Sequence, residues 1–467
     1  MLSPDEYKHV AELHYLEKKS RPEILAELSK RLKNPPTDNT MVNHWLEELR
    51  VLGVVAFDFD SSFAVVGDFN KDLSGRLTKE FALDQALVMD VSKHAQSDIK
   101  ADELHTALAN ESGKCLSGNE EFQGPLTPNS SILCAGGRTV VQVVRKIARS
   151  RLSSHGIRVD PLSGRNWTGS WQVVGEEDLE RPLDADDAAR TLASALAFPK
   201  SGTRFSQIGS PLYAETSRQA ERIMRDQCAF LPGGKWNWDI PGRSPRIAIC
   251  GVGSLKFGSG HRIMQFLEAY LHEHGVASGA DIDRLIQENG LADIQLPDKP
   301  AKSAPYLSTV AVDLLDAIKF AAQRRLGYFG DVANRLYPCL PLPSGLSASG
   351  PPRPDDYASL LAKLDVLNGR AIVAQWSHLR DTSTWITAGG RLKFPAIWTL
   401  AIARYLERQP SSGVGGRKSI MDRLTTDSVT AQNLLDELEE FKKAPSLVRD
   451  WYAQLAGMLF ASGKSAV

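Results

Sequence analysis

Two glycine-rich turns that lie far apart in the chain constrain its fold more than any other feature. The sequence Ala-Gly-Gly-Arg-Thr begins at residue 135, and Ala-Gly-Gly-Arg-Leu-Lys begins at residue 388. Each follows a short apolar run and precedes a helical pattern, as strand-to-helix turns do. Glycine allows a ligand to approach the backbone closely, and the N–H groups that open the next helix can bind an anion. The turns therefore predict an α/β sheet whose strand ends hold a phosphorylated small molecule.

A third expected strand, residues 246–252, also ends in glycine, with Gly251 and Gly253 followed by Ser254. Open α/β sheets bind ligands at the carboxyl ends of their strands, so three such ends favour a shared site. A packing turn or a dinucleotide motif is the alternative for these glycines. The third glycine of the dinucleotide pattern is absent, which argues against a nicotinamide cofactor. Further buried strands are expected at 131–135, 371–375 and 384–388.

The N-terminal 60 residues have a different pattern, with helices expected at 4–17 and 22–32 and a third after the Pro35-Pro36 stop. The third helix would end near Gly53, and the whole predicts a helix-turn-helix. Its outward polar side chains could read base edges, and nearby lysines and arginines could contact the DNA backbone. The candidate DNA-binding residues are Lys33, Thr37, Asn39, Thr40, Asn43 and His44. A helical domain kept for protein contacts is the alternative.

Composition limits the classes of function. At 467 residues the chain should hold two or three domains. Its 55 basic and 56 acidic residues leave a net charge of -1, so any attraction to DNA must be local. The five cysteines have neither metal-ligand spacing nor a disulfide pattern, which favours the cytoplasm and no metal. No export signal and no apolar run of about 18 residues is found, so no membrane contact is expected.

The C-terminal part suggests a separate unit. A glycine-rich segment at 411–416 is typical of a linker, and helical patterns follow at 428–443 and 445–461. We therefore expect a helix-turn-helix domain at 1–60, an α/β domain at 61–410, and a linker with a helical extension at 411–467. The extension should dock on its own α/β domain; contact with a partner subunit is the alternative.

An ordered set of motifs resembles the SorC-type sugar-binding transcriptional regulators. The residues that carry this resemblance are 13–16, 23–28, 52–55, 77–88, 136–140, 251–254, 327–332 and 388–397. The resemblance implies a helix-turn-helix followed by a doubly wound, sugar-isomerase-like α/β effector domain. Such proteins bind a phosphorylated sugar and double-stranded DNA, and they usually form homo-oligomers.

The resemblance also assigns roles to residues of the α/β domain. Gly137, Arg138 and Thr139 would form the phosphate loop, Ser254 would lie beside the sugar, and Lys393 would neutralise the phosphate. Asp331 would either orient sugar hydroxyls or act as a buried structural cap. The full set of candidate effector-binding residues is Gly136, Gly137, Arg138, Thr139, Gly251, Gly253, Ser254, Asp331, Gly389, Gly390 and Lys393.

The chain departs from the family in its recognition helix. The family usually places Ser-Arg-Pro and a later arginine there, whereas this chain has Asp38-Asn39-Thr40 and His44. Because arginine contacts to phosphate supply much of DNA affinity, the departure weakens the DNA-binding expectation. The leading hypothesis is a ligand-responsive transcriptional regulator without enzymatic activity or cofactor. The alternatives are a sugar-phosphate isomerase or deaminase that uses Asp331 as its base, and a protein-interaction module with a vestigial pocket.

Overall fold

The structure is a computed structural model. It describes residues 9–10, 13–14, 19–31, 41–42, 45–46, 66–91, 101–117, 131–149, 157–165, 184–196, 204–205, 207–227, 246–255, 263–264, 267, 270–271, 305–346, 351–380, 382–409 and 420–459.

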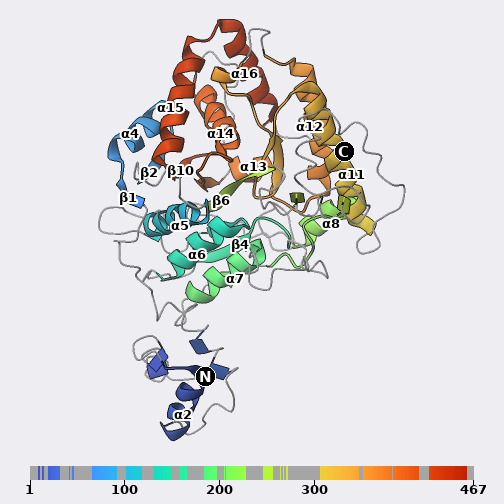
Figure 1. The fold of residues 1–467 in the computed structure, drawn as a ribbon. Helices are drawn as coiled ribbons and strands as arrows, with labels where there is room; N and C mark the ends of the chain where they lie inside the picture. Colours follow the sequence, from blue (N-terminus) through green and yellow to red (C-terminus); the bar gives the residue numbers. More distant parts are fainter. Residues whose placement is uncertain are drawn as a thin grey trace.

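The larger part of the molecule is built on one sheet with helices on both faces (Figure 1). Its strands are β1 (Val66–Phe69), β2 (Gln85–Val91), β3 (Ser131–Cys134), β4 (Arg158–Pro161), β5 (Arg204–Phe205), β6 (Arg246–Leu255), β7 (Phe329–Val332), β8 (Arg335–Pro338), β9 (Ser383–Thr387) and β10 (Arg423–Asp427). The main path runs β1-β2-β10-β9-β6-β3-β4-β5. From β2 to β5 all pairs are parallel, and β1 is antiparallel to β2.

The chain order reverses between β3 and β6, which makes this pair the topological switch point of the sheet. From β3 the chain builds outward to β4 and β5, then returns to β6 and builds toward β9 and β10. The predicted doubly wound α/β fold is confirmed. The second half of β6 continues past the sheet and pairs with the β7–β8 hairpin.

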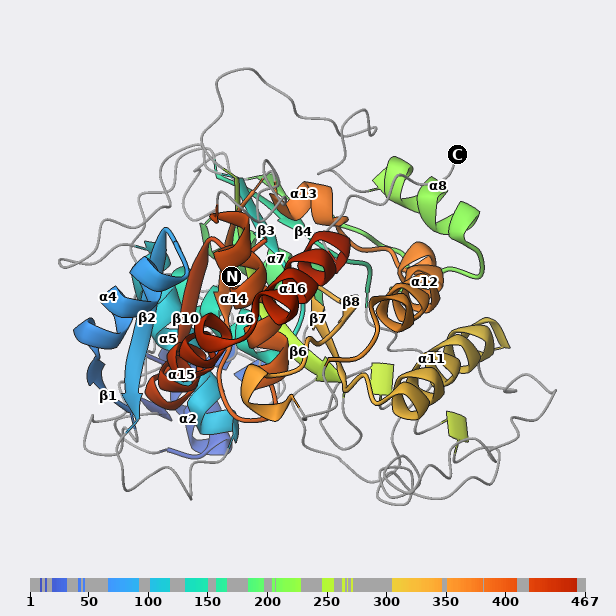
Figure 2. The ribbon, with the colours of Figure 1, turned by 90° about the horizontal axis from the view of Figure 1, so that it is seen from above.

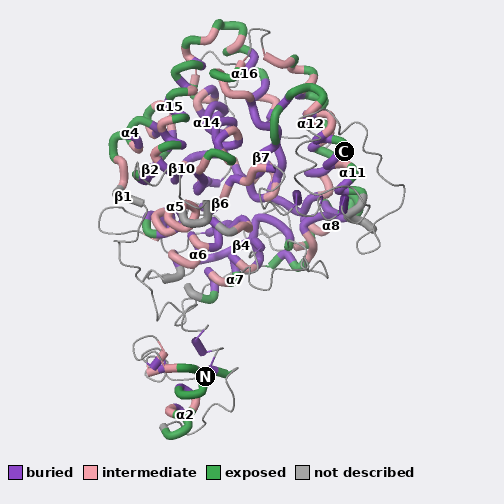
Figure 3. The backbone as a smooth tube through the Cα atoms, in the orientation of Figure 1, coloured by how far each residue is buried: buried purple, intermediate pink, exposed green. Residues whose placement is uncertain are grey.

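Helices cover both faces of the sheet, and others pack beside it. They are α4 (Lys71–Glu80), α5 (Ala101–Ser117), α6 (Arg138–Arg149), α7 (Ala185–Leu196), α8 (Ser217–Gln227), α11 (Pro305–Arg324), α12 (Pro354–Arg370), α13 (Trp376–Arg380), α14 (Phe394–Glu407), α15 (Ser428–Lys443) and α16 (Ser446–Leu459), with a 3-10 turn at Pro343–Gly345. Of these, α8, α11 and α12 pack together beside the sheet, next to the β7–β8 hairpin. In Figure 1, α5, α6 and α7 lie below the sheet and α4, α14, α15 and α16 above it, and Figure 2 looks down on the latter set. Both layers are amphipathic and bury their apolar sides against the strands (Figure 3).

The residues beyond 420 belong to this sheet. Strand β10 lies between β2 and β9, and α15 and α16 contribute Leu434, Leu438 and Leu455 to the same apolar core. The two predicted helices are present, and they dock on the α/β domain of the same chain, as the sequence led us to expect. The expected division at residue 410 does not separate two cores, because β10 completes the sheet.

A second predicted element differs from the structure. Residues 371–374 are buried as expected, but they form isolated bridges rather than a strand of the main sheet. Ala371 pairs with Tyr213, and Val373 pairs with Ser163. The apolar run reflects burial between neighbouring loops and not a sheet position.

The N-terminal residues have an apolar core of their own, formed by Val10, Leu13, Ile24, Leu28, Val42, Trp45 and Leu46. The expected second helix is α2 (Arg21–Arg31). Glu23 caps its start, because the Ser20 N–H and hydroxyl donate to Glu23 Oε2 at 2.7 and 2.6 Å. These hydrogen bonds lower the pKa of Glu23.

Candidate ligand site at the strand ends

The three glycine-bearing strand ends lie side by side in the structure. Strands β3, β6 and β9 are consecutive in the sheet, so their carboxyl ends open on one edge. A Cβ built on Gly251 would lie 3.7 Å from Val140 Cγ2 and 3.9 Å from the Thr387 carbonyl oxygen. Because neighbouring strands are about 4.8 Å apart, the turns after β3 and β9 are separated by roughly 10 Å. A sugar phosphate is long enough to contact both.

The turn after β3 is fixed at both ends. The Ala135 N–H donates to the Ile249 carbonyl of β6 at 3.0 Å, and the Val141 N–H donates to the Gly137 carbonyl at 3.1 Å. Gly137 has φ +107°, a conformation that favours glycine. Helix α6 begins at the next residue, and Thr139 in its first turn is buried. The leading N–H groups and the positive end of the helix dipole therefore face the switch point.

Asp184 lies against this turn and was not predicted from the sequence. A Cβ on Gly136 would lie 3.1 Å from the Ala185 nitrogen and 3.4 Å from the Asp184 carbonyl carbon, so only glycine fits easily. Asp184 Oδ1 accepts the Asp187 N–H at 2.8 Å, which caps α7. Burial raises the pKa of Asp184 to about 6. The Asp-x-x-Asp pattern at 184–187 is typical of a helix cap. No pattern in the sequence indicates that Asp184 lies beside Gly136.

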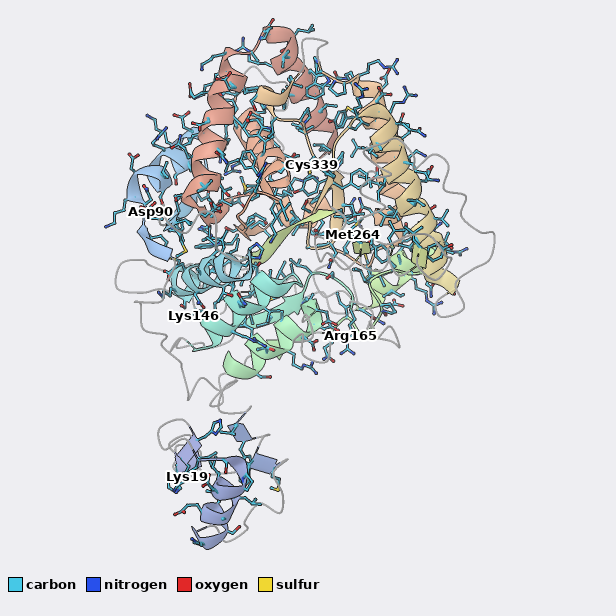
Figure 4. All side chains as sticks on the ribbon, in the orientation of Figure 1. Lys19, Asp90, Lys146, Arg165, Met264 and Cys339 are labelled. Atoms are coloured by element: carbon cyan, nitrogen blue, oxygen red, sulfur yellow. The ribbon has the colours of Figure 1, made fainter. Side chains whose placement is uncertain are left out.

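The neighbouring Asp186 has a structural role. Its Oδ1 accepts the Ile208 N–H at 2.7 Å, and its Oδ2 accepts from Arg165 Nε at 3.0 Å. Arg165, which is labelled in Figure 4, follows β4 and is one of the cations at this edge. Burial raises the pKa of Asp186, while the hydrogen bonds from Ile208 and Arg165 oppose the rise.

The turn after β9 holds a carboxylate of the protein itself. The Gly390 N–H donates to Asp427 Oδ2 at 3.0 Å and to Thr430 Oγ1 at 3.1 Å. Gly390 has φ +89°, and a Cβ on Gly389 would overlap Asp427 Oδ2. Lys393 is the N-cap residue of α14 and is half-buried. Both glycines are therefore needed for the contact with Asp427: Gly389 leaves room for its carboxylate, and Gly390 donates to it.

Three other candidate effector-binding residues, Gly253, Ser254 and Asp331, lie in the antiparallel pair β6–β7. Gly253 pairs with Asp331, and Ser254 pairs with Gly330. Asp331 is buried, and its Oδ2 accepts the Asn334 N–H at 3.0 Å. This contact caps the hairpin turn at Ala333 and Asn334, which both have positive φ. The cap is one of the two roles expected for Asp331.

The hairpin tip is tied to the switch-point edge. Asn334 Nδ2 donates to Ser163 Oγ, after β4, at 3.1 Å. Burial, and secondarily the negative charge of Asp331, raise the pKa of Cys250 and of Tyr213. Asp331 is therefore near residues of β6 and of the 211–214 segment.

Some predicted residues lie outside the described part. They are the side chain of Arg138 and all six candidate DNA-binding residues, Lys33, Thr37, Asn39, Thr40, Asn43 and His44. Within the described residues, no three histidine, cysteine or acidic side chains gather closely enough to hold a metal ion. In the same segments, no helix combines the length and apolar character needed to cross a membrane.

Comparison with protein-family models finds no match, and comparison with curated proteins finds none either. Several solved structures resemble this one. The full-length sorbitol operon regulator SorC from Klebsiella pneumoniae is 17% identical with a TM-score of 0.44, over 92% of this chain and 98% of that chain. A transcriptional regulator from Streptococcus pneumoniae is 12% identical with a TM-score of 0.42, over 79% and 97%. A DeoR family transcriptional regulator from Listeria monocytogenes is 13% identical with a TM-score of 0.40, over 78% and 98%.

Proposed function

We propose that this chain is a ligand-responsive, DNA-binding transcriptional regulator whose larger domain binds a phosphorylated sugar. The observation that carries the proposal is the convergence of three glycine-bearing strand ends at the switch point of a doubly wound sheet. The separate apolar core of the N-terminal residues supports a second, DNA-binding unit.

In the proposed complex, the phosphate binds at the turn after β3. The N–H groups that open α6, the Thr139 hydroxyl and the Arg138 guanidinium would donate to its oxygens. Lys393 would reach the same anion from the β9 side. The carboxylates of Asp184 and Asp331 would accept hydrogen bonds from sugar hydroxyls, with Ser254 beside the ring. Gly389 and Gly390 would shape the second turn rather than bind phosphate directly.

The DNA-binding role is assigned to the third N-terminal helix. Asn39 and Asn43 would read base edges, while Lys33, Thr37, Thr40 and His44 would contact the backbone or neighbouring bases. A homo-oligomer would place two such helices on adjacent half-sites. Ligand binding at the strand ends would then change the relative arrangement of these helices. Catalysis is not proposed: Asp331, the candidate base, accepts the Asn334 N–H in the hairpin turn, a contact that supports the role of a structural cap.

The ligand half of the proposal is tested by thermal shift with a panel of hexose and pentose phosphates. A ligand at about 100 times its dissociation constant should add roughly 2.7 kcal/mol to stability. Thr139→Val and Lys393→Ala should each abolish the shift while the apo protein stays folded. Lys79→Ala, on the exposed side of α4, is the matched control and should keep the full shift. A full response in both site variants would contradict the site.

The DNA half is tested by selection of genomic fragments with purified protein. Asn43→Ala should relax base preference at one position, whereas Lys33→Ala should weaken all sequences alike and reduce the salt slope by about 1. Failure to select any specific fragment would favour the protein-interaction alternative.

A further inference from the structure

We infer that Asp427 is a positioning residue of the ligand site, whose carboxylate fills the anion-binding end of the 388–393 turn and thereby holds Lys393 in place. The inference rests on the proposed function, since Lys393 must contact the ligand for its position to matter. It assigns the Gly-Gly pair of this turn to an internal anion and leaves the ligand's phosphate to the turn after β3.

The space at the turn supports this assignment. A side chain at Gly389 would overlap Asp427 Oδ2 and would come within 2.9 Å of Leu108 Cδ1 of α5. The Gly390 N–H, which would otherwise be available to a phosphate, donates to Asp427 Oδ2. A second negative group at the same position would overlap Asp427 Oδ2 and would compete with it for the Gly390 N–H. The Asp427 carboxylate therefore accounts for the presence of glycine at positions 389 and 390.

A chain of hydrogen bonds connects the carboxylate to Lys393. The Gly390 carbonyl accepts the Lys393 N–H at 3.2 Å, and the Lys393 carbonyl accepts the Ile397 N–H of α14 at 3.0 Å. Asp427 thus fixes Gly390, Gly390 fixes the backbone of Lys393, and Lys393 begins α14. A shift of Asp427 would move the origin of the lysine side chain.

On its other side, Asp427 is fixed by the start of α15. Its Oδ1 accepts the Thr430 N–H at 2.8 Å, and its Oδ2 accepts the Thr430 hydroxyl at 2.7 Å. The residue ends β10, which is held between β2 and β9. Because coupling between sites is reciprocal, ligand bound at Lys393 should in turn stabilise the first turn of α15.

The test compares Asp427→Asn with Thr425→Val. Thr425 lies two residues earlier in β10, is buried, and accepts a hydrogen bond from Trp385 Nε1 at 3.0 Å. Its replacement by valine removes this side-chain hydrogen bond in the same strand and keeps the backbone bond that the Thr425 carbonyl accepts from the Ala388 N–H. Both variants should lower the melting temperature. With the sugar phosphate that gives the largest thermal shift in the wild-type protein, Asp427→Asn should weaken binding at least about tenfold, and Thr425→Val should stay within about twofold of wild type.

A double variant separates positioning from a general structural role. If Asp427 acts through Lys393, then adding Asp427→Asn to Lys393→Ala should cost no further affinity. The residual binding of both variants is measured calorimetrically, at ligand concentrations well above those used for the thermal shift. Hydrogen exchange should also show ligand-dependent protection of residues 428–434 in the wild type and its loss in Asp427→Asn. If Asp427→Asn does not fold, Thr430→Val removes the hydroxyl shared by Gly390 and Asp427 and should show the same loss of affinity.

The outcomes distinguish the inference from the proposed function. A wild-type protein that responds to no sugar phosphate overturns the proposed function, and the inference with it. A wild-type response combined with equal affinities for Asp427→Asn and Thr425→Val overturns the inference alone. Additive losses in the double variant also overturn it, because Asp427 would then act independently of Lys393.

Discussion

Arg404 and Asp422 form a buried ion pair at the amino-terminal edge of the sheet, opposite the candidate ligand site. Arg404 Nη1 lies 3.3 Å from Asp422 Oδ1, and both side chains are almost fully buried. Arg404 Nε donates to the Ala82 carbonyl at 3.1 Å, and Asp422 Oδ2 accepts the Thr384 N–H at 3.0 Å. The pair therefore joins α14, β9 and β10 to the segment before β2.

Removal of one partner should be costly, because it leaves an uncompensated buried charge. We expect Arg404→Met to lower the free energy of unfolding by about 3–5 kcal/mol in urea titrations. The double variant Arg404→Met/Asp422→Leu should recover part of the loss. Arg449→Met, on an exposed side of α16, should change stability by no more than about 0.5 kcal/mol. An equally small effect at Arg404 would contradict the role of the pair.

Asp184 gives a prediction on pH. Burial raises its pKa from 3.8 to about 6 in the folded protein. The folded state therefore binds this proton more tightly than the unfolded state, and the group destabilises the fold as pH rises from about 4 to 6. Asp184→Asn keeps an oxygen acceptor for the Asp187 N–H but cannot titrate. Between pH 5 and 7.5, the melting temperature should fall more in the wild type than in Asp184→Asn. Parallel curves would refute the assignment.

Sequence reasoning singled out the glycines of the candidate site, but it did not predict the two carboxylates that lie beside them. Gly137 could be predicted because a glycine between a strand and a helix is a local signal. Asp184 and Asp427 could not, since their neighbours Gly136 and Gly390 are distant in the chain and the contacts depend on strand order. Short-range patterns identify a residue as a helix cap. Its contacts with residues distant in the chain become visible only when the order of the strands is known.

At the scale of elements, β10 is the largest departure from the sequence prediction. Its sequence, Arg-Leu-Thr-Thr-Asp, has one apolar residue, so hydrophobic periodicity does not reveal a central strand. Hydrogen bonding makes its burial possible: Thr425 Oγ1 accepts from Trp385 Nε1. Strands β3, β6 and β9 were predicted because each contains an apolar run and has glycines at or just after its carboxyl end.

Truncations test the role of the C-terminal elements. A chain ending at Gln409 lacks β10 and should show no cooperative unfolding of the larger domain, because β2 and β9 lose their shared partner. A chain ending at Ala444 keeps β10 and α15 but lacks α16, which buries Trp451, Tyr452 and Leu455, and the residues after it. It should fold but lose at least about 3 kcal/mol in a denaturant titration. Light scattering should give an unchanged number of subunits for this chain. Dissociation would instead support a subunit contact by α16.

At the scale of the whole molecule, the two apolar cores predict two separable activities. Ile24 is fully buried in the N-terminal core. Ile24→Ala should remove about 2–5 kcal/mol and unfold this core. DNA binding should then be lost, while the thermal shift by sugar phosphates is retained. Leu434→Ala is the complementary variant, because Leu434 of α15 lies in the core of the larger domain. It should lower the melting temperature of that domain, which is the unfolding step that sugar phosphates shift. Loss of both activities in Ile24→Ala would argue against separate cores.

The central position of β10 also affects how the chain can fold as it is made. The Val91 N–H of β2 donates to Ser428 Oγ across 337 positions of the sequence. A nascent chain on the ribosome would therefore carry β2 and β9 with unpaired inner edges until residues 423–427 emerge. Unpaired strand edges promote wrong association, and contacts this distant in sequence form slowly. This protein should accordingly depend on chaperones late in synthesis, and its yield should fall when translation stalls after β9.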